Sequence, residues 1–349
     1  MLGQTKHTPA RLPDGHPPVL LVVVDTEEEF AWDKPFDRNS TGTTSIAAQK
    51  IAHDRIYDKF GIVPTYVIDW PVATTPASIA AMRALMENGQ CEIGTHLHPW
   101  VSPPYDEAVS VHNSYTGNLP KELEFEKLRL LTEAITNNFG RKPITFKAGR
   151  YGLGPHTSEA LAKLGYLVDA SIVPYTSFTN DGGPDFSSFN EEPFWFGDPA
   201  QPLLELPVTT GFHGALRQYG SSIYPMLSTP PMKALHAGGI AARTGMLERI
   251  RITPEGGTAD DMKRIARTMA RNGSQVMTMT YHSPSIVAGH TPYVRTAAQL
   301  EGFLAAIEAF CGYFENVLGG TFMSVETLRA KMIRPMNSGS PAATRLESA

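Results

Sequence analysis

The chain has 349 residues, of which 42% are hydrophobic and 19% are charged, and its formal net charge at pH 7 is −5. This composition fits a globular protein with a sizeable core, and the acidic balance, without a cluster of Lys and Arg, argues against nucleic acid or an anionic membrane as a partner. The longest apolar run, VLLVVV at 19–24, is far shorter than the roughly 20 residues of a transmembrane helix, so no integral membrane segment is expected.

Two features of the sequence bear on the compartment. The N-terminus has no apolar stretch of the kind found in secretory signal peptides. The two cysteines, Cys91 and Cys311, stand in apolar surroundings, which is typical of buried free thiols in a reducing compartment rather than of a disulfide framework. We therefore expect a cytoplasmic protein, and the sequence leaves its oligomeric state open.

Composition divides the chain into a long central domain and two short ends. Residues 1–17 are polar and rich in proline, and residues 337–349 are small and polar, so both ends are predicted to be disordered. Residues 18–336 are expected to form a single domain.

Within this domain, short apolar runs alternate with helical patterns. Strands are expected at 19–25, 62–69, 91–96, 143–148, 167–171, 203–208, 275–282 and 321–325. Helices are expected at 44–59, 76–88, 120–139, 157–164, from 258 onward, and at 296–314, which begins with the capping-box pattern Thr296-x-x-Gln299. The stretches 99–119 and 172–257 are expected to be largely irregular, apart from the strand at 203–208.

The alternation of strands and helices predicts an α/β fold built on parallel strands. About seven strands in one circuit favour a (β/α) barrel over an open dinucleotide-binding sheet, since no G-x-G-x-x-G follows the first strand. The two long irregular stretches then belong over the C-terminal mouth of the barrel, where such folds place their functional sites.

Two pairs of candidate metal ligands stand at the ends of predicted strands. Asp25 and Glu27 are two residues apart, as are His96 and His98, so each pair points to one side of an extended chain. Two imidazoles and one carboxylate, with a coordination position left open, form a catalytic zinc-type ligand set, and the second carboxylate could act as general base. Taken alone, a histidine pair before Pro-Trp is more often structural, and an acidic run is more often solvated.

Three further stretches belong to the same mouth. FKAGRYG places Lys147 and Arg150 after the strand at 143–148, where a cation beside Asp25 would hold it ionised. Asp169 ends the strand at 167–171, and His282 ends the strand at 275–282. An Asp169–His282 pair would keep the imidazole protonated and ready to act as an acid. Surface charge, a turn cap and a buried structural histidine are the ordinary alternatives.

In chain order, the motifs VDTEEEF, EIGTHLHPWVSPP, KAGRYG, GYLVDASIVP, LELPV and YHSPS resemble those of polysaccharide deacetylases with NodB homology, a carbohydrate esterase type, and specifically the WalW-like branch. The resemblance covers roughly residues 18–330. It implies a distorted (β/α) barrel, one divalent metal ion and deacetylation of an amide.

Carried over residue by residue, the resemblance implies a role for each candidate. Asp25 matches the catalytic base, Glu27 the acidic metal ligand, and His96 with His98 the histidine motif. The segment of Tyr151 matches the loop whose backbone N–H helps to form an oxyanion hole. His282 matches the catalytic acid, and Asp169 matches the aspartate motif that precedes it.

The chain departs from the family pattern at three places. Thr26 separates two acidic residues that are usually adjacent, so Asp25 and Glu27 could exchange roles as base and ligand. The two histidines are two residues apart rather than four, so one of them could lie outside the ligand set. Lys147 stands where an arginine is common, and a lysine cannot grip a carboxylate in two places, so Arg150 could act instead.

These patterns predict a metal-dependent hydrolase that removes an acyl group, with N-acetyl favoured, from an amide on a sugar, oligosaccharide or lipid-linked glycan. Zinc is the favoured ion, and cobalt, nickel or iron also suit such ligands. Three alternatives were weighed. A non-haem iron enzyme uses the same ligand types on a jelly roll, a serine esterase would need a G-x-S-x-G motif that is missing here, and a degenerate barrel would bind glycan without turnover.

Overall fold

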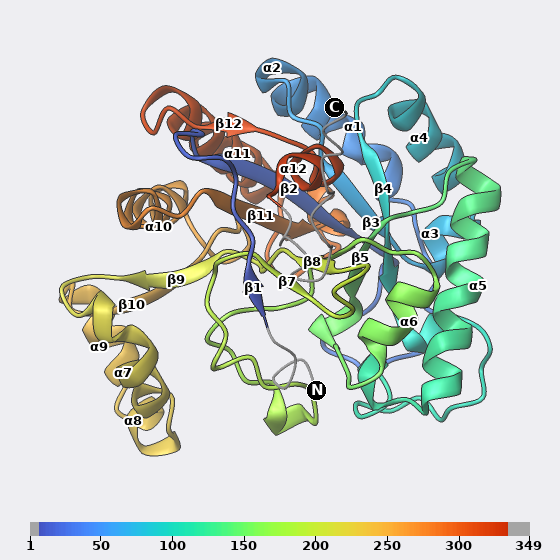
Figure 1. Cartoon of the computed structure of the whole chain (residues 1–349), viewed down its shortest axis with the longest axis horizontal. Helices are drawn as coiled ribbons and strands as arrows, with labels where there is room; N and C mark the ends of the chain where they lie inside the picture. Colours follow the sequence, from blue (N-terminus) through green and yellow to red (C-terminus); the bar gives the residue numbers. More distant parts are fainter. Residues whose placement is uncertain (1–6, 334–349) are drawn as a thin grey trace, which may run out of the picture.

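A curled sheet of parallel strands organises the computed structural model, which describes residues 7–333 (Figure 1). The parallel strands are β2 (Val19–Thr26), β3 (Thr65–Ile68), β4 (Glu92–Leu97), β5 (Thr145–Ala148), β6 (Val168–Asp169), β8 (Leu203–Glu205) and β11 (Val276–His282). They lie in the order β8-β6-β5-β4-β3-β2-β11, so neighbours along the chain are neighbours in the sheet. The predicted α/β fold with parallel strands in one circuit is confirmed.

The first predicted strand lies at the centre of the fold. All eight residues of β2 are buried, as a run of Val and Leu in a parallel sheet covered on both faces requires. β2 pairs in parallel with β11 on one side and with β3 on the other, and β12 (Thr321–Phe322) pairs with its beginning. The residues at its carboxyl end are therefore held from both sides.

Helices cover the sheet, and their starts and ends follow the sequence signals. α10 begins with a capping box between Thr258 and Asp261, and α11 begins with the predicted capping box between Thr296 and Gln299. The helical segments are η2 (Ile46–Ala48), α1 (Gln49–Ala52), η3 (His53–Tyr57), α2 (Asp58–Phe60), α3 (Trp70–Thr74), α4 (Pro76–Glu87), α5 (Lys121–Phe139), α6 (Thr157–Lys163), α7 (Gly220–Leu227), α8 (Pro230–Ala234), α9 (Ala237–Arg243), α10 (Ala259–Asn272), α11 (Ala297–Asn316) and α12 (Val325–Lys331).

β8 and β11 do not pair with each other within the described part of the chain, so the circuit of strands is not closed by a ladder there. A short irregular connection of Thr209 and Ile252, termed the seam, lies next to β11 instead. In this seam the N–H of Ile252 donates to the carbonyl oxygen of Thr209 over 2.9 Å. On the other side, Thr278 of β11 donates its N–H to Oγ1 of Thr209 over 2.7 Å, and Thr280 donates to the carbonyl oxygen of Ile252 over 3.3 Å. The barrel is distorted at this place.

The segment between the two halves of the seam is more regular than the sequence analysis expected. Residues 172–257 contain β7 (Phe194–Phe196), and β9 (Thr210–His213) pairs antiparallel with β10 (Glu248–Arg251). Between β9 and β10 the chain forms α7, α8 and α9, which lie together at the lower left of Figure 1, away from the sheet. The expectation of an irregular stretch was therefore wrong for 210–251, where proline and glycine stand inside or between short helices.

The N-terminal expectation also needs correction. β1 (Thr8–Pro9) pairs antiparallel with β7, and the side chains of Ala10 and Leu12 are buried. The prediction of disorder over 1–17 is wrong for this part, because two apolar residues within the polar segment pack into a core cluster. Residues 1–6 and the predicted tail at 337–349 lie outside the described residues.

Cys91 and Cys311 are both buried free thiols, as expected. Within residues 7–333, no helix combines the length and the apolar character needed to cross a membrane.

Candidate active site

Polar side chains from four parallel strands meet at the carboxyl edge of the sheet. In the strand register, Asp25 of β2 lies opposite His282 of β11, and His96 of β4 lies opposite Lys147 of β5. Parallel strands end at the same edge, so residues far apart in the sequence come together there, as the sequence predicted.

Glu27, His96 and His98 form a compact group with the geometry of a metal site. Oε2 of Glu27 lies 3.5 Å from Nε2 of His96 and 3.4 Å from Nε2 of His98. The three potential ligand atoms lie within 4.8 Å of one another, and all three residues are buried. The predicted ligand set is therefore brought together, and both histidines point the same ring nitrogen at the carboxylate.

The other ring nitrogen of each histidine is fixed by a partner. Nδ1 of His96 lies 2.9 Å from the carbonyl oxygen of Lys147, which can only accept, so this nitrogen carries the proton and Nε2 is free to bind. Nδ1 of His98 lies 2.7 Å from Oε2 of Glu28. A carbonyl or carboxylate behind each imidazole is the arrangement that orients histidine ligands of metal ions.

Glu28 is a residue that the sequence analysis missed. Its Oε1 accepts a hydrogen bond from the indole N–H of Trp100 over 2.7 Å, and its backbone N–H donates to Oδ2 of Asp69 over 2.7 Å. Glu28, Asp69 and His98 also lie close enough to hold an ion, but these hydrogen bonds already occupy them. Glu28 therefore acts as a support for His98, and its place within the run EEE is the only sequence signal for it.

The chemistry of the Glu27 group fits a divalent cation. Burial raises the pKa of Glu27 to about 7 and lowers the pKa of His98 to about 4, because a charged group that is buried away from water loses its hydration. Oε1 of Glu27 is buried and has no hydrogen-bond partner among the described residues. A cation between one carboxylate and two neutral imidazoles would satisfy all three groups.

Asp25 stands beside this group and is held by Lys147. Nζ of Lys147 lies 2.5 Å from Oδ1 of Asp25, and also donates to Oγ1 of Thr280 over 2.9 Å. Burial alone would raise the pKa of Asp25, but the ammonium of Lys147, together with His96 and His282, brings it below its usual value. The predicted cation beside Asp25 is thus Lys147 and not Arg150.

His282 lies on the other side of Asp25, and its partner differs from the predicted one. Nδ1 of His282 lies 2.7 Å from Oε2 of Glu255, which also accepts the N–H of His282 at Oε1 over 3.0 Å. Nε2 faces Oδ2 of Asp25 at 3.8 Å. Burial would lower the pKa of His282, but Glu255, Glu27 and Asp25 raise it well above its usual value, so the imidazole is held in its protonated form.

The predicted pairing of Asp169 with His282 is therefore wrong. Oδ1 of Asp169 accepts the hydroxyl of Ser171 over 2.5 Å, and Asp169 lies opposite Glu205 in the register of the neighbouring strand. Burial raises the pKa of Asp169 to about 7, and the pKa of Glu205 is also raised by burial and by Asp169. The raised pKa values favour one proton held between these two carboxyl groups. The partner of His282 is instead Glu255, directly after the seam.

Arg150 and Tyr151 form a turn at the end of β5. Both have a positive φ, 53° and 59°, which is uncommon for residues other than glycine and often marks a functional turn. Arg150 turns away from Asp25: it donates to Oγ of Ser114 over 2.6 Å and pairs with Asp181 at 3.5 Å. The ring of Tyr151 stays at the site, with Nζ of Lys147 5.3 Å from its centre.

A loop after β2 covers the site. The loop spans 29–42, and its two ends are joined by a hydrogen bond of 2.7 Å from the N–H of Glu29 to the carbonyl oxygen of Gly42. Trp32 in this loop meets the ring of His282 edge-on at 5.0 Å, and Phe30 meets His98 edge-on at 6.1 Å. The side chain of His282 remains 19% exposed while that of Asp25 is 3% exposed, so His282 is the member of the pair that substrate can reach.

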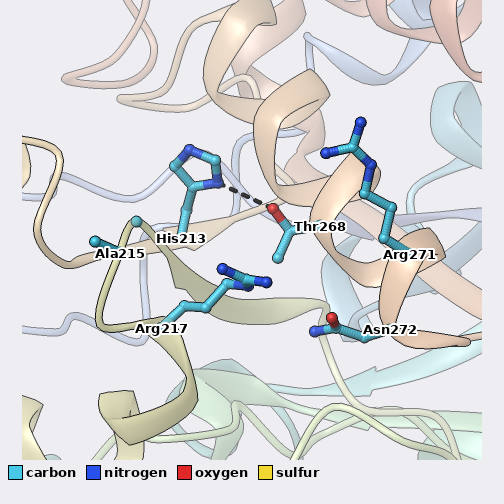
Figure 2. Close-up of a pocket in the computed structure, with 7 residues that line it drawn as sticks. His213, Ala215, Arg217, Thr268, Arg271 and Asn272 are labelled. Atoms are coloured by element: carbon cyan, nitrogen blue, oxygen red, sulfur yellow. Dashed lines mark hydrogen bonds between the residues drawn. The ribbon is translucent and has the colours of Figure 1, made fainter.

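A separate hollow lies between β9 and α10 (Figure 2). It has a volume of about 280 Å³ and is lined by residues that include Arg217 and Arg271. His213 bonds to Oγ1 of Thr268 there over 2.9 Å, as the dashed line in Figure 2 marks. None of the residues described above at the carboxyl edge of the sheet contributes to this hollow.

A comparison with models of known protein families and a comparison with curated proteins both found no match. Among solved structures, the chain is similar to a Mycobacterium smegmatis protein assigned as a polysaccharide deacetylase, with 16% identity, a TM-score of 0.50, and 93% of this chain and 92% of that chain covered. It is also similar to the Puue allantoinase, with 14% identity, a TM-score of 0.52, and 91% of each chain covered. The resemblance to polysaccharide deacetylases is thereby confirmed at the level of the fold, and the WalW-like branch stays a prediction.

Proposed function

We propose that this chain, which has the fold of polysaccharide deacetylases, is a metal-dependent hydrolase that removes an acyl group from an amide on a sugar. The favoured acyl group is N-acetyl. One observation carries the proposal. Oδ2 of Asp25 and Nε2 of His282 face each other at 3.8 Å, directly beside the Glu27, His96 and His98 group, and the pKa of Asp25 is lowered while that of His282 is raised. A base and an acid with separated pKa values next to a cation site are the groups that amide hydrolysis requires.

Each side chain has one task in this proposal. Asp25, kept ionised by Lys147, takes a proton from the attacking water at Oδ2, the oxygen that Lys147 leaves free. His282 donates its Nε2 proton to the nitrogen of the leaving amine, and Glu255 stabilises the imidazolium from the opposite side of the ring. The turn of Arg150 and Tyr151 offers its backbone N–H groups to the developing oxyanion.

Glu27, His96 and His98 would hold the divalent ion, zinc in the first place, and the bound ion would supply Lewis-acid polarisation of the amide carbonyl. Supported by Lys147 and Glu28, the two histidines present unprotonated nitrogens before any ion arrives. The two histidine side chains are thus oriented before a metal ion binds, so they need little rearrangement when it does.

The other candidate functions have less support. A non-haem iron oxygenase on a jelly roll needs antiparallel sheets, whereas this fold is built on parallel strands. A glycan-binding barrel without turnover has no use for a protonated His282 opposite an ionised Asp25. We also propose membership of the WalW-like branch and a cytoplasmic location, the latter supported by the buried free thiols of Cys91 and Cys311.

The proposal is tested by acetate release from N-acetylated mono- and oligosaccharides with the zinc-loaded protein. We expect release by the wild-type chain and a loss of about 10²–10⁴ in rate in Asp25→Asn. The matched control is Asp185→Asn, the same change at an exposed position, which should leave the rate unchanged. Glycan binding without any acetate release would show a binding protein and refute the proposal.

A further inference from the structure

Two arginines beside the candidate active site have no role in the chemistry described so far. Arg249 and Arg251 stand two residues apart on β10, so both side chains leave the same face of the strand. Both residues are only partly exposed. Across residues 7–333, neither guanidinium forms an ion pair with a carboxylate, although nearly every other partly buried cation near the site does.

Arg251 is close to the catalytic group. Its Nη1 donates to the hydroxyl of Tyr151 over 3.3 Å, and its Cζ lies 5.6 Å from the centre of that ring. Nζ of Lys147, the partner of Asp25, lies 5.3 Å from the centre of the same ring. The guanidinium of Arg251 and the cation that holds the catalytic base therefore contact the same aromatic ring.

The backbone places Arg251 firmly. Ile252, the next residue, belongs to the seam and accepts a hydrogen bond from the N–H of Thr280, two residues before His282. Glu255, three residues further, binds His282 itself. The guanidinium thus extends from a segment that is fixed to the same strand as the catalytic acid.

Arg249 is anchored and adds charge. Its Nη1 donates to the carbonyl oxygen of Tyr175 over 2.7 Å and to Oγ1 of Thr176 over 2.6 Å, and its Cζ lies 4.8 Å from the ring centre of Tyr224. These partners are neutral, so they fix the guanidinium without neutralising it. The two arginines together place two positive charges on one face of β10, next to Tyr151 of the site.

We propose that Arg251, reinforced by Arg249, binds an anionic group of the substrate, a carboxylate or a phosphate ester on the sugar that carries the amide. The inference rests on the proposed function and names the substrate class for it. Arg251 has five N–H donors and uses one of them on Tyr151, which leaves a planar fork of the kind that matches carboxylate and phosphate oxygens. The cation–π contact with the ring of Tyr151 offsets part of the positive charge of Arg251. The remaining N–H groups of the guanidinium form no hydrogen bond with this ring and can donate to a ligand.

The experiment compares matched sugars on the zinc-loaded, full-length protein. The probes are N-acetylglucosamine, N-acetylglucosamine 6-phosphate and N-acetylmuramic acid, which differ in having no anion, a phosphate and a carboxylate. We expect the wild-type chain to bind at least one anionic sugar more tightly than the neutral one, as measured by calorimetry. Arg251→Gln should reduce this preference about tenfold to a hundredfold, and Arg251→Lys should keep part of it.

The hollow of Figure 2 supplies the control, because Arg217 there also forms no ion pair within the described part of the chain. Arg217→Gln makes the same change of charge and should leave the preference intact. If Arg217→Gln removes the preference and Arg251→Gln does not, or if wild type binds all three sugars equally, the inference is wrong. Circular dichroism of Arg251→Gln and Arg251→Lys shows whether both variants fold.

Binding and turnover separate this inference from the proposed function. If no sugar releases acetate, yet an anionic sugar binds through Arg251, the hydrolase proposal fails and the anion site stands. If acetate is released from neutral and anionic sugars with the same kcat/KM in wild type and in Arg251→Gln, the hydrolase stands and the anion site is refuted. Comparing the affinities for N-acetylglucosamine 6-phosphate and N-acetylmuramic acid then shows whether Arg251 prefers a phosphate or a carboxylate.

Discussion

The imidazole of His282 differs from those of His96 and His98 in the direction in which its surroundings shift its pKa. Carboxylates face both nitrogens of His282, at 2.7 Å from Glu255 and 3.8 Å from Asp25. Carboxylates also face both nitrogens of His98, but burial dominates there and lowers its pKa to about 4, whereas at His282 burial is outweighed by Glu255, Glu27 and Asp25, which raise its pKa. The first environment favours a protonated acid, and the second favours neutral ligands.

This difference predicts that metal binding and turnover can be separated by mutation. His282→Ala leaves all three ligands untouched, so the protein should retain its zinc while acetate release falls by about 10²–10⁴. His98→Ala should lose both zinc and activity. Zinc content by mass spectrometry alongside the activity assay checks this, and release of zinc from His282→Ala would make His282 a ligand.

Glu28 should act on the metal through His98 rather than by direct contact. Its carboxylate binds Nδ1 of His98 and the indole N–H of Trp100, so Glu28→Gln presents an amide that can no longer accept at both positions. We expect zinc affinity to fall about 10–100-fold, as for other supporting carboxylates of metal-bound histidines. Competition with a chelator measures the affinity, and Glu126→Gln on the surface of α5 is the control. An unchanged affinity would reduce Glu28 to a packing residue.

At the scale of elements, the loop at 29–42 covers the site. Glu29 closes the base of this loop by accepting the N–H of Ser45 over 2.6 Å and the hydroxyl of Thr44 over 2.8 Å. A compact loop with joined ends packs by its own side chains, here Phe30 and Trp32 against the histidines of the site. Arg38 within the loop adds a second anchor by donating to the carbonyl oxygen of Tyr105 over 3.0 Å, so the cover is held at its base and at this point.

Glu29→Ala should loosen this cover without unfolding the barrel. We expect faster amide hydrogen exchange in residues 30–41, and little change in exchange of β2 or α11, because the sheet does not depend on the loop. Exchange measured by mass spectrometry checks it. Glu301→Ala removes the surface ion pair with Arg55 and should leave the loop as it is. Equal exchange in both variants would show that Glu29 does not restrain the loop.

The elements also show how far the sequence could predict the molecule. β2 is a run of apolar residues up to Asp25, β11 is a strand of β-branched, apolar and aromatic residues, and α10 and α11 begin with capping boxes, so local patterns were sufficient. The antiparallel pair β9 and β10 was missed because its two strands are separated by three short helices. No local pattern reports a pairing across such an insertion.

The same limit applies to the site. Residues at strand ends were predicted together because parallel strands share an edge. The partners that fix them, Glu255 and Glu28, come from loop positions that only the tertiary fold brings near. Asp169 was predicted to pair with His282 because it also ends a strand. In the structure, Asp169 lies opposite Glu205 in the sheet, and the partner of His282 is Glu255.

At the scale of the whole molecule, the pair of Asp169 and Glu205 links stability to pH. The folded state keeps a proton on Asp169 up to a pH of about 7, whereas the unfolded chain releases it near pH 4. The contribution of this pair to the free energy of unfolding is therefore complete below about pH 4. It declines by about 1.4 kcal/mol per pH unit per proton as the pH rises toward 7.

Asp169→Asn should weaken this dependence, because the amide cannot titrate. We expect the melting temperature of the wild-type chain to fall from pH 5 to pH 8 by more than that of the variant. Thermal melts followed by circular dichroism at both pH values measure the difference. Asp185→Asn, at an exposed position, serves as the control. A variant with the same pH dependence as the wild type would show that the two carboxyl groups do not share a proton.

The seam between Thr209 and Ile252 has a consequence for how such a protein can change over generations. Because these two residues are bonded to each other, the excursion of 210–251 leaves and re-enters the barrel at one point. Its length and content can vary at little cost in chain entropy, while the barrel on either side stays as it was. Arg249 and Arg251 lie inside the excursion, whereas Glu255 and His282 lie outside it. If the proposed function holds, recombination or insertion within this excursion alters which substrate is bound, while the residues at the strand ends stay as they were.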